Sequence, residues 1–121
     1  GVIGYIKDIS RRKKAEKKLK KQEKLLRYQA SYDALTGLPN RVLFQDRLEQ
    51  SIEKAKRHNT KFAIFFLDLD RFKQINDSLG HEVGDMVLEK ASGIIKSTLR
   101  KEDTLARLGG DEFVIITGDI P

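Results

Sequence analysis

The stretch RLGGDEFVII, residues 107–116, places two glycines and two acids between two short apolar runs. Gly-Gly-Asp is common in the turns of β-hairpins, so the stretch predicts a hairpin. The same turn would also suit a metal ion and a phosphate, because backbone without Cβ atoms can approach an anion closely. The turn alone does not decide between the two interpretations, which depend on what lies beside it.

The longest apolar run of the chain is KFAIFFLDLD, residues 61–70, and it predicts a strand that is buried on both faces. Asp68 and Asp70 end this run, and the alternation of side chains along a strand turns both to the same face. Carboxylates at such a position suit a hard divalent cation. Alternatively, Asp70 caps the helix that begins near Arg71.

The acids of the glycine turn bear on the same site. If the strand that ends in Asp68 lies beside the hairpin, Asp111 and Glu112 would converge with it around Mg²⁺ and leave open positions for substrate phosphates.

The other segments predict a mostly helical framework. Helices are expected over residues 10–32, 41–58, 71–79 and 82–100, and DALTGLPN at 33–40 breaks the chain. The core-facing positions of the helices over 41–58 and 82–100 are Leu43, Phe44, Leu48, Ile52 and Ala55, and Val83, Val87, Ala91, Ile94 and Thr98. The order helix, strand, helix, helix, hairpin predicts an α/β fold of the α+β sandwich type, with a central, mostly antiparallel sheet flanked by helices.

The first 32 residues differ in character from the rest. GVIGYIKDI at 1–9 predicts a strand without a partner, which suggests the last strand of a domain upstream. In the charged helix that follows, a thin seam is formed by Ala15, Leu19, Gln22, Leu26 and Gln29. This pattern fits a solvated helix, a dimerising signalling helix, or a contact with a membrane or nucleic acid.

Composition narrows the classes of function. The 121 residues are 39% hydrophobic and 35% charged, as expected for a soluble protein of one domain plus an appendage. The net charge of +6 is uneven, because residues 1–27 carry 11 Lys/Arg against 3 Asp/Glu whereas residues 28–121 carry 13 against 15. We therefore expect no nucleic-acid partner for the folded body. The chain has no apolar run of roughly 20 residues and no signal sequence, so we expect no direct membrane insertion of this segment. We expect a cytoplasmic protein or the cytoplasmic part of a larger sensor protein.

Three motifs occur in order along the chain: DALTGLPNR at 33–41, FLDLDRFKQINDSLGHEVGD at 66–85 and RLGGDEF at 107–113. Together they resemble the GGDEF family, the diguanylate cyclase domains. The resemblance implies a nucleotidyl-cyclase or ferredoxin-like palm over 33–121 that is incomplete at its C-terminus. Residues 1–19 resemble the end of a PAS sensor domain, with 1–9 as its final strand and 10–32 as a signalling or coiled-coil linker helix.

The resemblance also implies an activity. Family members condense two GTP into cyclic di-GMP and release two pyrophosphates, with each subunit of a homodimer presenting one GTP. By match to the motifs, the ligands of Mg²⁺ or Mn²⁺ would be Asp68, the Leu69 carbonyl, Asp111 and Glu112. The catalytic residues would be Asp111 and Glu112. Glu112 would act as a metal ligand or as the group that favours deprotonation of the 3′-hydroxyl.

Further positions match the substrate and product sites of the family. Substrate would be bound by Phe72, Lys73, Asn76, Asp85, Gly109 and Gly110, with Lys73 at the triphosphate and with Asn76 and Asp85 at the guanine base. The ordinary alternatives are a helix-terminating cap for Asn76 and a first-turn acid for Asp85. Arg100 and Asp103 match an inhibitory site for cyclic di-GMP, and their alternative is an exposed ion pair at the end of a helix.

Three functions of different classes follow. The first is a sensor-regulated diguanylate cyclase. The second is a catalytically silent regulatory module that binds GTP or cyclic di-GMP, alone or next to a phosphodiesterase domain. The third is a scaffold whose basic helix binds nucleic acid or membrane, which the mildly acidic body disfavours.

Overall fold

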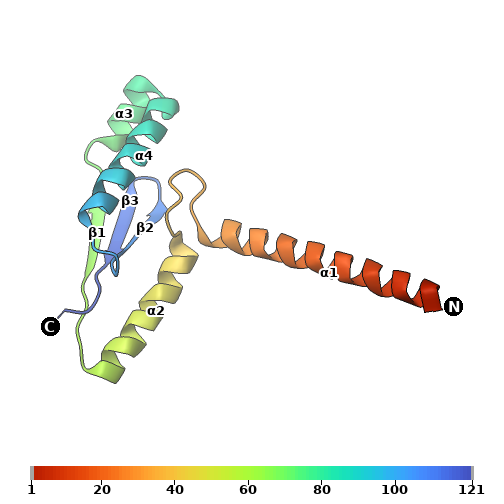
Figure 1. The fold of residues 1–121 in the computed structure, drawn as a ribbon. Helices are drawn as coiled ribbons and strands as arrows, with labels where there is room; N and C mark the ends of the chain where they lie inside the picture. The colour runs from red at the N-terminus through yellow and green to blue at the C-terminus, as the bar shows by residue number, and fades with distance from the viewer. Residues whose placement is uncertain (1, 121) are drawn as a thin grey trace. The chain divides into compact units, whose positions relative to one another are not determined.

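The computed structural model describes residues 2–120, so that Gly1 of the expected strand and Pro121 at the end of the expected domain lie outside the described residues. The chain divides into two compact units, Gly1–Ala30 and Ser31–Pro121. In chain order the elements are α1 (Val2–Ser31), α2 (Arg41–His58), β1 (Ile64–Asp68), α3 (Phe72–Leu79), α4 (His81–Thr98), β2 (Thr104–Gly109) and β3 (Glu112–Ile116) (Figure 1). After the first helix, the predicted order of helix, strand, helix, helix and hairpin is confirmed.

The N-terminal unit is one helix, and the strand predicted over residues 1–9 is wrong for the residues described there. Val2–Ser31 is helical throughout, and none of its described residues is buried. A strand needs a partner for its backbone hydrogen bonds, whereas a helix satisfies them within the segment. The resemblance to the end of a PAS domain, which rests on a strand here, has no counterpart in this helix.

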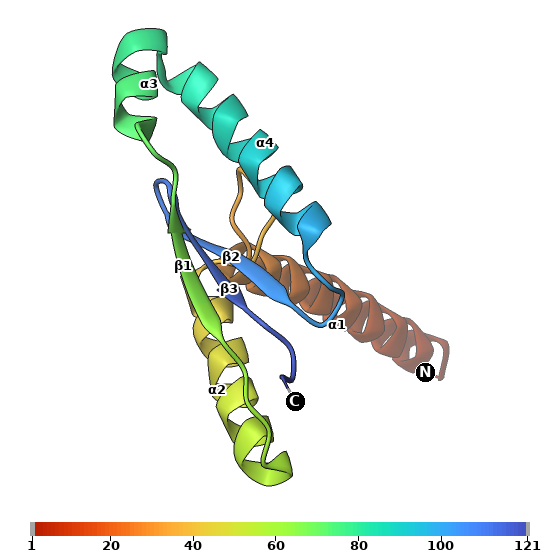
Figure 2. The same ribbon diagram turned by 90° about the vertical axis from the view of Figure 1, so that its left-hand side faces the viewer.

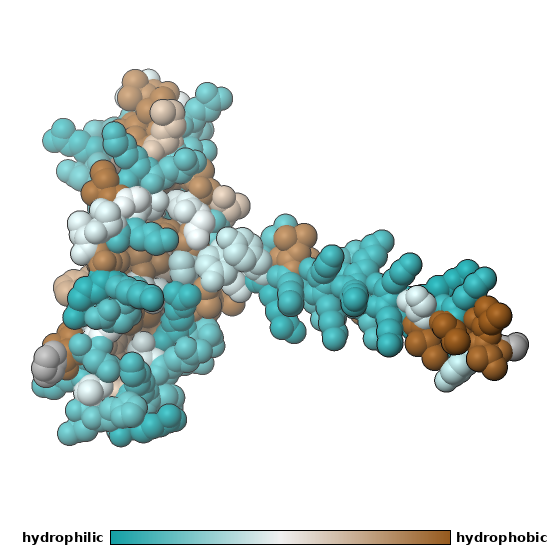
Figure 3. All heavy atoms as spheres, in the orientation of Figure 1, coloured by the Kyte–Doolittle hydropathy of each residue, from teal (hydrophilic) through white to brown (hydrophobic). Residues whose placement is uncertain are grey.

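The side chains along the middle of α1 are predominantly hydrophilic, whereas apolar ones gather near its N-terminal end and, as a smaller group that includes Leu25 and Leu26, near its C-terminal end (Figure 3). Among the described residues, no helix combines the length and the apolar composition that crossing a bilayer requires.

Helix α2 begins and ends where its sequence provides caps. The Asn40 side chain accepts a hydrogen bond from the Leu43 N–H at 3.1 Å, which satisfies one of the free donors of the first turn. At the other end, Asn59 adopts the left-handed conformation with φ of 51°. Asparagine tolerates this conformation better than most residues do, and it is a frequent helix terminator.

The three strands form one antiparallel sheet in the order β1-β3-β2 (Figure 2). The hairpin predicted from the glycine turn is present as β2 and β3, and β1 pairs with the other edge of β3. The expectation of a largely antiparallel central sheet is therefore confirmed.

Burial of β1 was predicted wrongly. All five of its residues are exposed, and Phe66 retains 71% of its accessible surface. The strand lies at an edge of the described sheet, where only β3 borders it. The continuous run that is buried on both faces is instead the central strand, with Phe113, Val114, Ile115 and Ile116.

The two faces of the sheet carry separate apolar clusters because side chains alternate along β3. On one face, Val114 and Ile116 pack with Ala106 and with Phe44 of α2. On the other face, the cluster consists of Leu38, Phe72, Leu88, Leu105, Phe113 and Ile115, which brings in α3 and α4. Helices thus cover both faces, as expected of the sandwich.

The face of α4 that packs on the sheet is rotated from the predicted one. The buried positions are Gly84, Leu88 and Ser92, whereas Val83, Val87 and Ala91 are only partly buried and Ile94 and Thr98 are exposed. The apolar periodicity missed this because two of the buried positions hold small residues, which bring the helix close to its neighbours without contributing apolar area. On α2, Phe44 is buried as predicted, but Ile52 is 38% exposed.

Candidate functional site

The hairpin turn has a backbone that needs glycine. Gly110 has φ of 48° and Gly109 has φ of 154°, and the pairing between β2 and β3 shifts between Arg107 and Gly109. The positive φ of Gly110 is costly for most side chains. Both glycines are exposed, so the backbone of the turn is accessible to a ligand.

Strand β1 ends beside this turn, as the metal hypothesis required. Asp68 is paired directly with Glu112 across β1 and β3, and directly opposed residues point to the same face of a sheet. The backbone continues the contact, since the Leu69 N–H donates a hydrogen bond to the Asp111 carbonyl at 3.4 Å. The four residues predicted to hold a metal ion are therefore neighbours in space.

A hollow of about 240 Å³ opens at this end of the sheet. Asp68 and Glu112 line it together with Arg41, which is the first residue of α2. Sequence reasoning missed Arg41 because it lies in an ordinary helix start, and only the fold brings it to the same hollow as two acidic residues.

The oxygen donors at this site suit a hard cation, although the carboxylates are not already clustered as in a complete metal site. Among residues 2–120, no cluster of three or more His, Cys, Asp or Glu side chains has the arrangement of a metal site. Magnesium typically takes only one or two protein carboxylates and completes its shell with water and substrate phosphates. Two carboxylates on paired strand ends and a nearby carbonyl satisfy that requirement.

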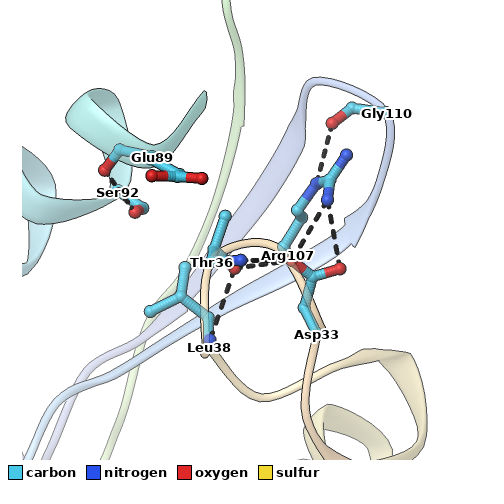
Figure 4. A network of polar contacts seen from close by, with 7 residues as sticks. All are labelled: Asp33, Thr36, Leu38, Glu89, Ser92, Arg107 and Gly110. Atoms are coloured by element: carbon cyan, nitrogen blue, oxygen red, sulfur yellow. Dashed lines mark hydrogen bonds and ion pairs between the residues drawn. The ribbon is translucent and has the colours of Figure 1, made fainter. Parts of the chain in front are cut away.

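Arg107 joins the turn to the segment that follows α1 (Figure 4). Its Nη1 donates to both carboxylate oxygens of Asp33 at 3.1 Å, and its Nε donates to the Gly110 carbonyl at 2.9 Å. The side chains of Arg107 and Asp33 are 14% and 21% exposed, so this ion pair is mostly shielded from water. Sequence reasoning missed this pair, because a charged residue within a strand next to a turn gives no local sign of its partner.

Asp33 is fixed by more than the arginine. It also accepts hydrogen bonds from the Thr36 N–H at 2.9 Å and from the Thr36 hydroxyl at 2.7 Å. Partial burial raises the pKa of Asp33, but the hydrogen bonds from Thr36 and Arg107 outweigh it, and the net pKa lies below the usual value. The carboxylate is therefore held in its charged form.

The residues expected to bind substrate on the helices lie on the α3–α4 pair. Phe72 is buried in the core, Lys73 is exposed, Asn76 is half-buried and Asp85 is exposed. Among the described residues, no hydrogen bond or ion pair joins the side chains of Asn76 or Asp85 to the hairpin turn, so their approach to a common ligand remains a prediction.

The alternative, structural roles fit these residues poorly. Arg71, with φ of 60°, occupies the N-cap position of α3 and no side chain caps that helix, so the expected cap by Asp70 is wrong. Asn76 caps nothing with its side chain, because its Oδ1 is buried without a hydrogen-bond partner. The acid in the first turn of α4 is Glu82 rather than Asp85.

Arg100 and Asp103, by contrast, carry the structural contacts that were the alternative to an inhibitory site. Arg100 Nε lies 3.6 Å from Asp103 Oδ2, and the backbone N–H groups of Arg100 and Gly118 donate to the Asp103 carboxylate at 2.9 and 2.8 Å. The pKa of Asp103 is lowered, and the hydrogen bond from the Gly118 N–H is the largest cause. Both residues border a cavity of about 380 Å³ whose lining includes Arg47, Lys96 and Lys101.

Comparison with known proteins gives the family of the chain. The family description "Diguanylate cyclase, GGDEF domain" matches residues 30–121. The chain belongs to the GGDEF family.

Individual relatives agree with this assignment. The "Bifunctional diguanylate cyclase/cyclic di-GMP phosphodiesterase MucR" of Pseudomonas aeruginosa is 52% identical over 87 residues, which are 72% of this chain and 13% of that protein. The solved GGDEF domain of TpbB from the same organism is 46% identical with a TM-score of 0.71, covering 74% of this chain and 52% of that one.

A third relative includes the N-terminal helix. The coiled coil and GGDEF domain of DgcB from Caulobacter crescentus, solved in complex with c-di-GMP, is 29% identical with a TM-score of 0.88. That match covers 93% of this chain and 59% of the DgcB chain. The present chain thus spans little more than half of these solved domains and a much smaller part of MucR.

Proposed function

We propose that residues 33–121 form a diguanylate cyclase domain that presents one GTP, and that two copies of the chain join two GTP into cyclic di-GMP with release of two pyrophosphates. The observation that carries the proposal is the pairing of Asp68 with Glu112, continued by the hydrogen bond from Leu69 to Asp111. It supports a single site in which carboxylates and an accessible glycine backbone act on the same phosphate. The names of the relatives support the same reaction.

In the proposed reaction, the 3′-hydroxyl oxygen of one GTP forms a bond to the α-phosphorus of the other. The bond from that phosphorus to the oxygen that bridges to the β-phosphate breaks, and pyrophosphate leaves with the electron pair. Glu112, exposed at the start of β3, would accept the proton of the attacking hydroxyl. The exposed backbone of Gly109 and Gly110 would lie against phosphate oxygens, since no Cβ atom keeps them apart.

The ligands of Mg²⁺ or Mn²⁺ would be Asp68, Asp111, Glu112 and the Leu69 carbonyl. When bound, the ion would stabilise negative charge on the transferring phosphoryl group. On α3, Lys73 and the backbone at Phe72 would contact the triphosphate.

Guanine would be selected on the α3–α4 pair. A carboxylate at Asp85 can accept hydrogen bonds from both N1–H and the exocyclic amine of guanine, which adenine does not offer together. Asn76 would provide the second contact to the base. The unpartnered Oδ1 of Asn76 supports this role, since a buried acceptor left unpaired is unfavourable and is found at functional sites.

We further propose that product binds at Arg100 and Asp103 and inhibits the enzyme. The guanidinium suits N7 and O6 of guanine, and the surrounding lysines and Arg47 would favour the phosphates of the product. Binding there would have to break or share the present ion pair between Arg100 and Asp103.

The experiment that tests the cyclase is incubation of the concentrated chain with GTP and Mg²⁺, followed by chromatography with mass detection of cyclic di-GMP. We expect product from the parent chain and none from Asp111→Ala. Product that survives Asp111→Ala would overturn the assignment of the site.

A second candidate is a silent module that binds GTP or cyclic di-GMP beside a phosphodiesterase. It is favoured by a relative that is named for the phosphodiesterase activity alone, the "Cyclic di-GMP phosphodiesterase NbdA" of Pseudomonas aeruginosa, which is 48% identical over 91 residues. Calorimetric titration distinguishes it from the cyclase, because the silent module would bind GTP saturably and form no product.

A further inference from the structure

We propose that Gly84 is a positioning residue for nucleotide selection, which acts by leaving room for the amide of Asn76 against helix α4. The inference rests on the proposed function, in which Asn76 contacts guanine. It adds a residue that touches no ligand itself.

The first observation is what surrounds Gly84. The residue is buried, and a Cβ at this position would clash with Asn76 Oδ1 and lie 2.9 Å from Asn76 Cγ. The next neighbour, Phe72 Cζ, would be at 3.4 Å, which is only a tight contact. The group that fills the space of the missing side chain is therefore the amide of Asn76, on the neighbouring helix α3.

The second observation is that the side-chain oxygen of Asn76 is held there without a hydrogen bond. Its Oδ1 is buried and has no partner among the described residues. Side-chain packing, rather than a polar contact, thus determines where the amide lies. A change in the packing surface, such as a methyl group at residue 84, would move it.

The third observation is that glycine at this position destabilises the helix that contains it. Glycine is among the least favourable residues in a helix interior, and α4 contains two of them, Gly84 and Gly93. Gly93 is exposed, and a Cβ there would meet nothing within 4 Å. Of these two glycines, only Gly84 has neighbouring atoms in the space that a Cβ would occupy.

The expected consequence concerns binding more than stability. The displaced group is the end of a side chain and can move, so the fold can accommodate alanine at residue 84. The contact of Asn76 with the base would then be lost or distorted, while Asp85, next in the sequence, remains. Guanine binding should weaken and the preference for guanine over adenine should fall.

The test compares Gly84→Ala with Gly93→Ala in the same helix. The probes are 3′-deoxy-GTP and 3′-deoxy-ATP, which lack the attacking hydroxyl and so bind without reacting. We expect Gly84→Ala to weaken binding of 3′-deoxy-GTP about tenfold, the scale of one lost hydrogen bond, with little change for 3′-deoxy-ATP. Gly93→Ala should leave both affinities unchanged.

A double-mutant cycle with Asn76→Ala identifies the route of the effect. If Gly84 acts through Asn76, Gly84→Ala has no further effect on selectivity once residue 76 is alanine. Should Gly84→Ala fail to fold, restored folding in the double variant would show the same steric contact, and failure of both to fold would overturn it.

The outcomes also separate this inference from the proposed function. The role of Gly84 alone is overturned if the parent chain prefers the guanine analogue and Gly84→Ala retains that preference. It is also overturned if Gly84→Ala lowers the preference as much in the Asn76→Ala background as in the parent chain. A parent chain with no preference for guanine overturns the guanine site and this inference with it.

Discussion

Arg107 contacts two segments that are more than 70 residues apart in sequence, and its side chain is only 14% exposed. Arg107→Met should lower the free energy of unfolding by roughly 1–3 kcal/mol, because it leaves the Asp33 carboxylate without a shielded partner. Urea unfolding measures the change. Arg100→Met is the matched control, since its side chain is 59% exposed and its ion pairs should contribute less than about 1 kcal/mol. Equal losses in both variants would contradict the prediction.

The carboxylate of Asp33 should make stability depend on pH. Its pKa in the folded chain lies below the ordinary value of 3.8, so the unfolded chain binds a proton more readily. The stabilisation is therefore complete above the unfolded pKa and is lost as the pH falls through the folded pKa. Asp103, whose pKa is also lowered, contributes in the same window.

The measurement is the free energy of unfolding from neutral pH to below pH 3.8, the ordinary pKa of these groups. Asp33→Asn should be less stable than the parent at neutral pH and should lose less stability on acidification. If the two curves run parallel through the acid range, the pKa of Asp33 is not lowered by folding.

Among the elements, α2 depends on one side chain for its start. Asn40 accepts from the Leu43 N–H, and Phe44 of the first turns is buried in the core, so a frayed start would disturb packing on the sheet. Asn40→Ala should cost about 1 kcal/mol of stability, whereas Asn40→Ser keeps an acceptor and should cost little. Thermal unfolding followed by circular dichroism measures both. An equal loss in the two variants would argue against capping as the cause.

How far the sequence predicts the elements depends on whether the deciding interaction is local. The glycine turn, the two helices on either side of Gly80 and the start of α2 at Arg41 are local features, and all occur where expected. Burial of β1 was misjudged because Phe65 and Phe66 show the composition of a central strand, whereas position in the sheet depends on partners far along the chain. The helix over residues 2–9 was missed for the same reason, since β-branched residues favour strands only where a neighbouring strand exists.

The candidate site was predictable to a similar extent. The acids at the end of β1 and in the turn could be named from their spacing in the sequence. The sequence did not show that they are adjacent, because this depends on the pairing of β1 with β3, which the structure provides. Arg41 and the partner of Arg107 could not be named, because long-range packing alone brings them to the site. Gly84 was passed over because the significance of a missing side chain depends on the atoms that fill its place.

At the scale of the whole molecule, two units of different physical character share one chain. Both apolar clusters draw only on residues between 35 and 116, so the body has a core of its own. Helix α1 has no buried residue in the unit it forms. Isolated helices are only marginally stable in water, so a helix of this kind gains from pairing its apolar positions with a second copy. Such pairing would also bring two copies of the body into one assembly, as the proposed reaction requires.

Pairing through α1 makes a prediction that two adjacent leucines can test. Leu26 belongs to the expected seam with Leu19, whereas Leu25 does not, and the two are similarly exposed at 64% and 57%. Leu26→Asn should raise the dissociation constant of the dimer at least about tenfold, because each copy loses an apolar group worth roughly 1.5–3 kcal/mol when buried. Leu25→Asn should change it little. Sedimentation at several concentrations measures the constant, and cyclic di-GMP formation should fall in parallel for Leu26→Asn alone. Equal effects of the two substitutions would mean that this seam is not where the helices meet.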